Sequence, residues 1–136
     1  MTALELPPGT ALPSLSGPAL TRTVLALFAG GSGDLNPIHL DLDVARSAGL
    51  DDVFAQGMLS MAVLGRLLTG WTDQRNLRSF RVRFATITPV NAQPRCTGTV
   101  VSVDEVDGER RATIDLTVTL ADGTVTLTGD AVVAVS

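Results

Sequence analysis

The longest apolar stretch of the chain lies between residues 57 and 68, and its composition favours a helix. It is rich in Leu, Met and Ala, which are good helix formers, and Arg66 is its only charged residue. Because the stretch has no polar face, a helix here is expected to be buried all round. At 1.5 Å per residue it would form a rod of about 18 Å that other elements must wrap.

The second half of the chain alternates apolar and polar residues with a period of two, which is typical of strands with one face on the core. Asp-Gly pairs at 107–108 and 122–123 separate these runs, and Asp-Gly is a strong hairpin signal. We therefore predict about four meandering antiparallel strands after the helix. Their approximate ranges are 80–84, 95–106, 112–120 and 125–135.

A sheet that curls around one central helix satisfies both patterns, which predicts the α+β class. A parallel βαβ fold does not, because no helices lie between these strands. Residues 1–20 hold four of the seven prolines and are predicted to form an extended N-terminal arm over the core. With no internal repeat and no second region, residues 1–136 are predicted to form a single domain.

Two short helices are predicted between the arm and the central helix. The first begins with Thr21 or Thr23 as its N-cap and ends at the glycine cluster of residues 29–33. The second begins at Asp41 or Asp43, whose carboxylates can accept hydrogen bonds from the first helical N–H groups.

The composition excludes several kinds of chemistry. All ten basic residues are Arg, so neither a Schiff-base lysine nor a Walker-type phosphate loop is available. A single Cys96 and a single His39 cannot build a Cys/His zinc site or an intrachain disulfide. The net charge of −4 argues against a nucleic-acid partner. Without a basic region before Arg22 or an apolar run of membrane-spanning length, we expect a cytoplasmic protein with no membrane partner.

Unusual residues gather in the loop that precedes the second short helix. Asp34 and the only imidazole, that of His39, lie five positions apart, and Asn36-Pro37 favours a turn that would bring them together. Two such groups could hold one water molecule, one taking a proton and the other delivering one. The alternative is that Asp34 caps a turn and His39 is a surface residue, and residue types alone favour this alternative.

The start of the apolar helix offers a second candidate. The first N–H groups of a helix have no internal partner and carry positive partial charge, so the Gly57 N–H could bind a ligand carbonyl. Alternatively, Gly57 only permits tight entry of the chain into the core. Met58 and Met61 are expected mainly to pack, and Cys96 is expected to be a core residue without an activating neighbour.

Residues 28–41, Phe-Ala-Gly-Gly-Ser-Gly-Asp-Leu-Asn-Pro-Ile-His-Leu-Asp, resemble the hydratase motif of the MaoC-like hot-dog-fold family. That family includes (R)-specific enoyl-CoA hydratases and (3R)-hydroxyacyl-ACP dehydratases. The similarity continues through residues 56–58 and 80–84 and covers about residues 21–135 in order. It implies the hot-dog fold, in which a curved antiparallel sheet wraps a long central helix. Gln56 departs from the pattern, since many members have His there.

The resemblance implies reversible hydration of trans-2-enoyl thioesters to (R)-3-hydroxyacyl thioesters. By position, Asp34 and His39 are similar to the catalytic pair, and Gly57 to the residue whose N–H polarises the thioester carbonyl. The residues that would support and shape the loop are Ser32, Gly33 and Asn36. No metal or redox cofactor is implied, because CoA or the pantetheine of an acyl-carrier protein is part of the substrate.

Partners are likewise implied by the resemblance. A hot-dog sheet leaves edge strands that need cover, so we expect a homodimer, or a heterodimer with a related subunit. Some members are non-catalytic halves of heterodimers, but retention of Asp34 and His39 favours the catalytic half. Acyl-thioester hydrolysis is the alternative activity on this fold. Met58 and Arg83 are further candidates for substrate contact, with Arg81 and Arg95 beside Arg83 as possible phosphate ligands.

Overall fold

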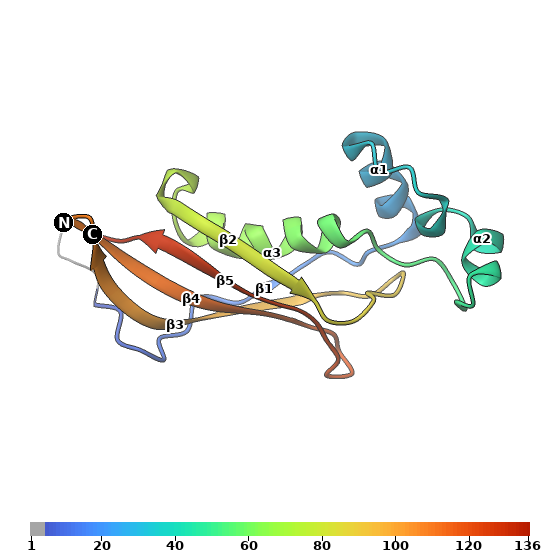
Figure 1. The fold of residues 1–136 in the computed structure, drawn as a ribbon. Helices are drawn as coiled ribbons and strands as arrows, with labels where there is room; N and C mark the ends of the chain where they lie inside the picture. Colours follow the sequence, from blue (N-terminus) through green and yellow to red (C-terminus); the bar gives the residue numbers. More distant parts are fainter. Residues whose placement is uncertain (1–4) are drawn as a thin grey trace.

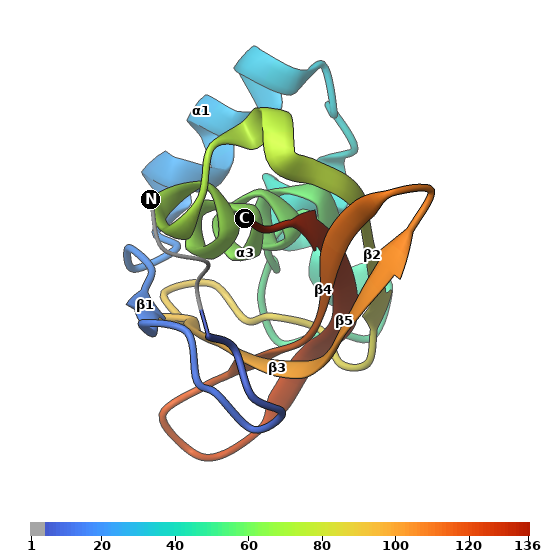
Figure 2. The same cartoon turned by 90° about the vertical axis from the view of Figure 1, so that its left-hand side faces the viewer.

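One antiparallel sheet of five strands curls around one long helix (Figures 1 and 2). The structure, a computed structural model, describes residues 5–136. The strand order is β1-β3-β4-β5-β2. The strands are β1 (Leu15–Ser16), β2 (Leu77–Phe84), β3 (Arg95–Val106), β4 (Glu109–Thr119) and β5 (Val125–Ala134). The helices are α1 (Arg22–Ser32), α2 (Leu42–Ser47) and α3 (Gly57–Trp71), with short 3-10 helices at Pro37–His39 and Gln74–Asn76.

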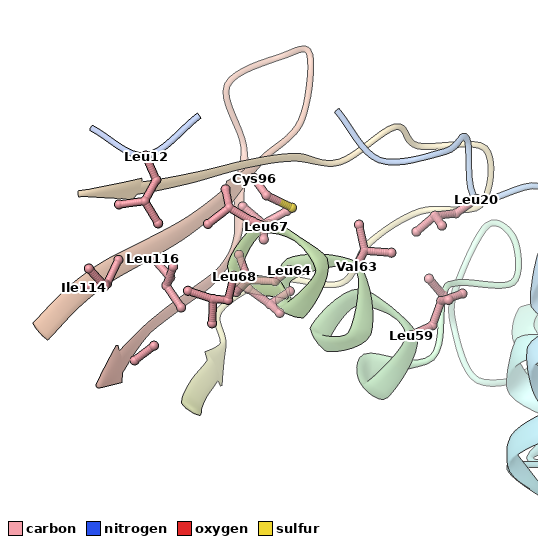
Figure 3. Close-up of a cluster of buried hydrophobic side chains, with 14 of the residues drawn as sticks. Leu12, Leu20, Leu59, Val63, Leu64, Leu67, Leu68, Cys96, Ile114 and Leu116 are labelled. Atoms are coloured by element: carbon pink, nitrogen blue, oxygen red, sulfur yellow. The ribbon is translucent and has the colours of Figure 1, made fainter. Parts of the chain in front are cut away.

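The central helix α3 is longer than predicted and is covered on one side only. It extends to Trp71, and its buried face packs into the concave side of the sheet (Figure 3). The residues on that face include Leu59, Val63, Leu64, Leu67 and Leu68. Met58, Ala62 and Arg66 on the other side are exposed. The expectation of burial all round is therefore wrong for a single chain, because the sheet curls around only part of the helix.

The meander prediction is correct for three strands and wrong for β2. Strands β3, β4 and β5 follow one another through hairpins, and the first hairpin turns at Asp107 and Gly108, whose φ angles of 52° and 77° are both positive. Such angles are those of the type I′ turn that Asp-Gly favours. Strand β2 pairs with β5 instead of β3, so residues 85–94 connect the two opposite sides of the sheet.

The alternation in β5 is broken near its start. Thr126 is buried and Val125 is exposed, the reverse of the predicted pattern. Val118 of β4 pairs with Leu127, and Thr119 pairs with Val125, so Thr126 is an extra residue between two paired positions. A bulge of this kind shifts the side-chain parity by one residue, and period-two reasoning cannot locate it.

The two short helices begin as predicted, and the first ends within the predicted glycine cluster. The Thr21 side chain accepts a hydrogen bond from Val24 N–H, and the Asp41 carboxylate caps α2. Helix α1 continues through the first glycines and stops at Gly33, whose φ of 80° is left-handed. Both helices lie at one end of the molecule, beyond the sheet in Figure 1.

The described part of the predicted N-terminal arm, residues 5–20, runs along β3 as an extended segment, and residues 1–4 of that prediction lie outside the described residues. Backbone hydrogen bonds join Gly9 N–H to Val100 O and Leu12 N–H to Gly98 O, and β1 pairs with the start of β3. Arm residues Leu12 and Leu20 contribute side chains to the core (Figure 3). Within residues 5–136, no helix combines the length and apolarity that crossing a membrane requires.

Candidate active site

The loop after α1 is shaped by its own short polar side chains. The left-handed Gly33 reverses the chain at the end of α1. Asp34 N–H then donates to Ser32 Oγ at 3.1 Å, and Asn36 N–H lies 3.4 Å from Asp34 Oδ1. The Asn36 side chain in turn accepts from Ile38 N–H at 3.2 Å and starts the 3-10 helix. These local bonds are typical of Asn, Asp and Ser in turns.

His39 ends this 3-10 helix with its ring buried. Ring atom Nδ1 lies 2.8 Å from the carbonyl oxygen of Phe54, and the imidazole packs edge-on to the Phe54 ring with centroids 4.7 Å apart. A carbonyl oxygen only accepts hydrogen bonds, so Nδ1 carries the proton that it donates. In the neutral imidazole, Nε2 then has a free lone pair.

The structure brings Asp34 and His39 together. His39 Nε2 lies 3.9 Å from Asp34 Oδ2, which is too long for a direct hydrogen bond. One oxygen atom placed about 2.8 Å from each of these two atoms satisfies both. Since the His39 side chain is only 10% exposed and that of Asp34 is 40% exposed, the pair joins the interior to the solvent. This arrangement suits general acid–base chemistry on a single water or hydroxyl.

Gly57 is the first residue of α3 and lines a cavity of about 360 Å³. Gln56 precedes it without capping the helix through its side chain. The wall of the cavity includes Phe54, Ser60, Phe84, Ile87 and Leu127. A side chain at Gly57 would place its Cβ 3.1 Å from Phe84 Cε1, so the aromatic ring would have to shift by a few tenths of an ångström to make room for it.

Phe54 connects the two halves of the candidate site. Its carbonyl oxygen holds the His39 ring. Phe54 also lines the same cavity as Gly57, which follows it by three residues. Neither Asp34 nor His39 belongs to the wall of this cavity. Ser32 instead lines a shallow groove of about 460 Å³ between α1 and the start of α3, with Leu59 on its other side.

The other two predicted contact residues lie away from this cavity. Met58 points to the exposed side of α3, with 59% of its surface accessible. Arg83 lies on the outer face of the sheet, in a separate depression of about 590 Å³. Arg81 shares that depression, where it forms an ion pair with Asp130 at 3.1 Å. The structure therefore places neither Met58 nor Arg83 in the wall of the cavity at Gly57.

Sequence reasoning missed the residues that tie α1 to the segment before α3. The fully buried Gln56 donates from Nε2 to Leu25 O at 2.9 Å. Arg22 forms an ion pair with Asp52 at 2.6 Å, and its hydrogen bond lowers the pKa of the Asp52 carboxyl. Both pairs are 30 or more positions apart, so no local sequence pattern reveals them.

Ser60 was also missed, although a signal for it was present. It is a polar residue three positions after Gly57 in an apolar helix, and residues so spaced share a helix face. Cys96, in contrast, behaves as predicted. It lies fully buried in the core, and burial raises the pKa of its thiol to about 11. Among residues 5–136, no three His, Cys, Asp or Glu side chains cluster as metal ligands do.

A protein-family model described as "MaoC like domain" matches residues 7–122 of the chain. The chain belongs to the MaoC-like dehydratase family. A curated relative of this MaoC-like chain is the 3-hydroxyacyl-thioester dehydratase Z of Mycobacterium tuberculosis (strain H37Rv). The two are 30% identical over 106 residues, which cover 73% of this chain and 70% of the relative.

Solved structures share the architecture of this MaoC-like chain. The (R)-hydratase from A. caviae involved in PHA biosynthesis superposes with a TM-score of 0.81 and 24% identity, over 98% of both chains. The ChsH1–ChsH2 complex from Mycobacterium tuberculosis contains a chain with the same TM-score and 21% identity, over 100% of both chains. The predicted family, hot-dog fold and hydratase or dehydratase class are thus confirmed.

Proposed function

We propose that this chain adds water reversibly to trans-2-enoyl thioesters and forms (R)-3-hydroxyacyl thioesters. The observation that carries the proposal is the 3.9 Å separation of His39 Nε2 and Asp34 Oδ2, with Nδ1 fixed by Phe54. Family membership supports the same reaction class, since the curated relative is named a 3-hydroxyacyl-thioester dehydratase.

In the hydration direction, Asp34 and His39 act on one water molecule. The carboxylate and the Nε2 lone pair are both acceptors, so each accepts a hydrogen bond from one O–H of that water. The water oxygen bonds to C3 of the enoyl group while one member of the pair accepts its proton, and a proton from the pair is delivered to C2. Dehydration reverses these steps, and the pair returns to its starting protonation state in either direction.

Gly57 N–H stabilises the charge that develops on the thioester oxygen. As water attacks C3, electron density moves through C2 to the carbonyl and forms an enolate. The N-terminal N–H of α3 is unpaired within the helix and carries the positive end of the helix dipole. A donor of this kind contributes about 3–4 kcal/mol of transition-state stabilisation in comparable oxyanion sites.

The substrate carries its own carrier group, either CoA or the pantetheine arm of an acyl-carrier protein. Adding water to a double bond requires no external oxidant or reductant, so the proposed reaction calls for no further cofactor. We expect it to take place in the cytoplasm.

A second hot-dog subunit completes the proposed assembly. The helix α3 leaves Met58 and Ala62 exposed, and β2 is the last strand of the sheet order, with one side unpaired within the described chain. Covering such an edge and such an apolar face removes an aggregation hazard. A homodimer or a heterodimer satisfies both, and the ChsH1–ChsH2 structure is a precedent for two different chains. Light scattering on the purified chain distinguishes a monomer from a dimer.

The proposed reaction is tested by following the ultraviolet absorbance of crotonyl-CoA, which falls as the conjugated double bond is hydrated. The expected result is hydration that yields the (R)-3-hydroxyacyl product on chiral analysis and that is lost in Asp34→Asn. Release of free thiol without hydration would instead indicate an acyl-thioester hydrolase. Activity that appears only after a related hot-dog chain is added would indicate an obligate heterodimer.

A further inference from the structure

Ser60 has a buried hydroxyl that nothing in residues 5–136 satisfies. The residue is 3% exposed, and its Oγ has no hydrogen-bond partner in this part of the chain. A helical serine commonly donates to the carbonyl four residues earlier. Here that carbonyl, of Gln56, lies 3.1 Å from Leu59 N and 3.3 Å from Ser60 N. A buried hydroxyl without a partner destabilises the fold, so its presence points to a partner that arrives later.

The position of Ser60 on α3 identifies where that partner binds. Ser60 follows Gly57 by three residues, and helical side chains lean toward the N-terminus over the preceding turn. Both residues line the same cavity, whose other walls include Phe54, Phe84 and Leu127. In this largely apolar wall, the Ser60 hydroxyl and the Gly57 N–H are two hydrogen-bond donors that share one helix face.

We propose that the Ser60 hydroxyl is a second donor to the thioester carbonyl, acting together with the N–H of Gly57. The inference rests on the proposed function and extends it by one residue. Ser60 forms no covalent bond and keeps its proton throughout, while the carbonyl oxygen accepts both hydrogen bonds. Because the enolate oxygen carries more charge than the carbonyl oxygen, both bonds strengthen as the reaction proceeds.

Phe84 packs over Gly57 in the free protein and lines the same cavity as Ser60. Its ring packs against Gly57, and 52% of its surface is exposed, so no tight packing fixes the ring in place. The bound thioester displaces the ring and takes its place beside the two donors.

The kinetic test compares Ser60→Ala with Ser47→Ala, which removes an exposed serine hydroxyl from α2. For Ser60→Ala we expect kcat for crotonyl-CoA hydration to fall about tenfold or more, with KM within about twofold. Its melting temperature should stay equal or rise, because an unsatisfied buried hydroxyl is removed. Ser47→Ala should keep the wild-type rate. A kcat for Ser60→Ala within about twofold of wild type would overturn the proposal.

A spectroscopic test separates this inference from the proposed reaction. Butyryl-CoA has no double bond to hydrate, so its carbonyl stretch can be measured by difference infrared spectroscopy while it is bound. We expect a lower frequency on the wild-type protein than on Ser60→Ala, since one hydrogen bond is lost. Equal frequencies would refute the role of Ser60 even if hydration occurs. A difference without any hydration would support Ser60 and refute the proposed reaction.

Discussion

The imidazole of His39 is held by the main chain of Phe54, with Nδ1 2.8 Å from the carbonyl oxygen. This bond fixes both the orientation of the ring and the nitrogen that is free to accept a proton. Phe54 precedes Gly57 by three residues, so one short segment carries both the anchor of the His39 ring and the donor to the thioester carbonyl. The acid–base pair and the carbonyl donor are therefore positioned by a common piece of backbone.

Substitution of either member of the pair should abolish hydration and leave the fold intact. We expect Asp34→Asn and His39→Gln each to lower kcat/KM for crotonyl-CoA by about 10²–10⁴-fold, the range for loss of a general acid or base. Asn at position 34 keeps an oxygen for the bond from Asn36 N–H, so the loop should persist. Initial rates and circular dichroism measure the two effects, and near-normal rates in either variant would contradict the mechanism.

Gly57→Ala should lower activity because the added methyl group fills the space beside the N-terminus of α3. The new Cβ would lie 3.1 and 3.2 Å from Phe84 Cε1 and Cζ, and the half-exposed ring can shift by the few tenths of an ångström needed. The methyl then occupies the approach to the N–H, so we expect kcat to fall by at least about tenfold. Steady-state kinetics with a thermal melt distinguish this effect from unfolding.

The double variant Gly57→Ala/Phe84→Leu tests the cause of that loss. A smaller side chain at position 84 gives the methyl room, yet the approach to the N–H remains blocked. Activity should therefore stay low, and recovery would show that displacement of Phe84 was responsible. Gly30→Ala is the matched control, because it adds a methyl in open space on α1. That control should keep full activity and gain about 0.5–1 kcal/mol of stability.

Local patterns in the sequence were sufficient for several elements but not for the role of the loop at Asp34 and His39. The period of two located β4, and Asp107-Gly108 located its hairpin, because both signals depend on neighbouring residues. The turn at Asn36-Pro37 made the approach of Asp34 and His39 one of two options, and only the family resemblance favoured it over a surface histidine. The structure places the two side chains 3.9 Å apart. The bonds that fold this loop join residues only two positions apart.

Features that depend on distant parts of the chain could not be predicted. The place of β2 beside β5, the anchoring of His39 by a backbone carbonyl and the bond from Gln56 to Leu25 all join segments that no local pattern links. The exposed side of α3 was missed for another reason. An apolar helix indicates that its surface will be covered, but it does not indicate how much of that surface the sheet of the same chain covers.

Acid should weaken the fold through Glu109 of β4, whose carboxylate forms hydrogen bonds with an arginine of β2 and one of β4. Its carboxylate accepts hydrogen bonds from Arg78 of β2 and Arg111 of β4 at 2.8 Å, and they lower its pKa to about 2 from an ordinary value of 4.5. As the pH falls below 4.5, the unfolded chain binds a proton that the folded chain still excludes, so stability declines until about pH 2. Urea unfolding between pH 6 and 2 should show this decline.

Glu109→Gln is the control for that pH dependence. The amide does not titrate, so the variant should show a smaller loss of stability over the same pH interval, and its stability at neutral pH should be lower than that of the wild type. An unchanged pH dependence would show that Glu109 contributes no linkage to folding.

Gly129→Ala should destabilise the pairing of β2 with β5. A Cβ at Gly129 would collide with the carbonyl oxygen of Arg81, a main-chain atom that cannot rotate away as a side chain could. Strand β2 would have to move, and strain of this kind costs about 1–3 kcal/mol. Gly70→Ala adds the same methyl in open space near the end of α3 and should not destabilise. Urea unfolding should therefore give a lower midpoint for Gly129→Ala alone, with an unchanged slope, and equal midpoints for the two variants would mean that β2 accommodates the methyl.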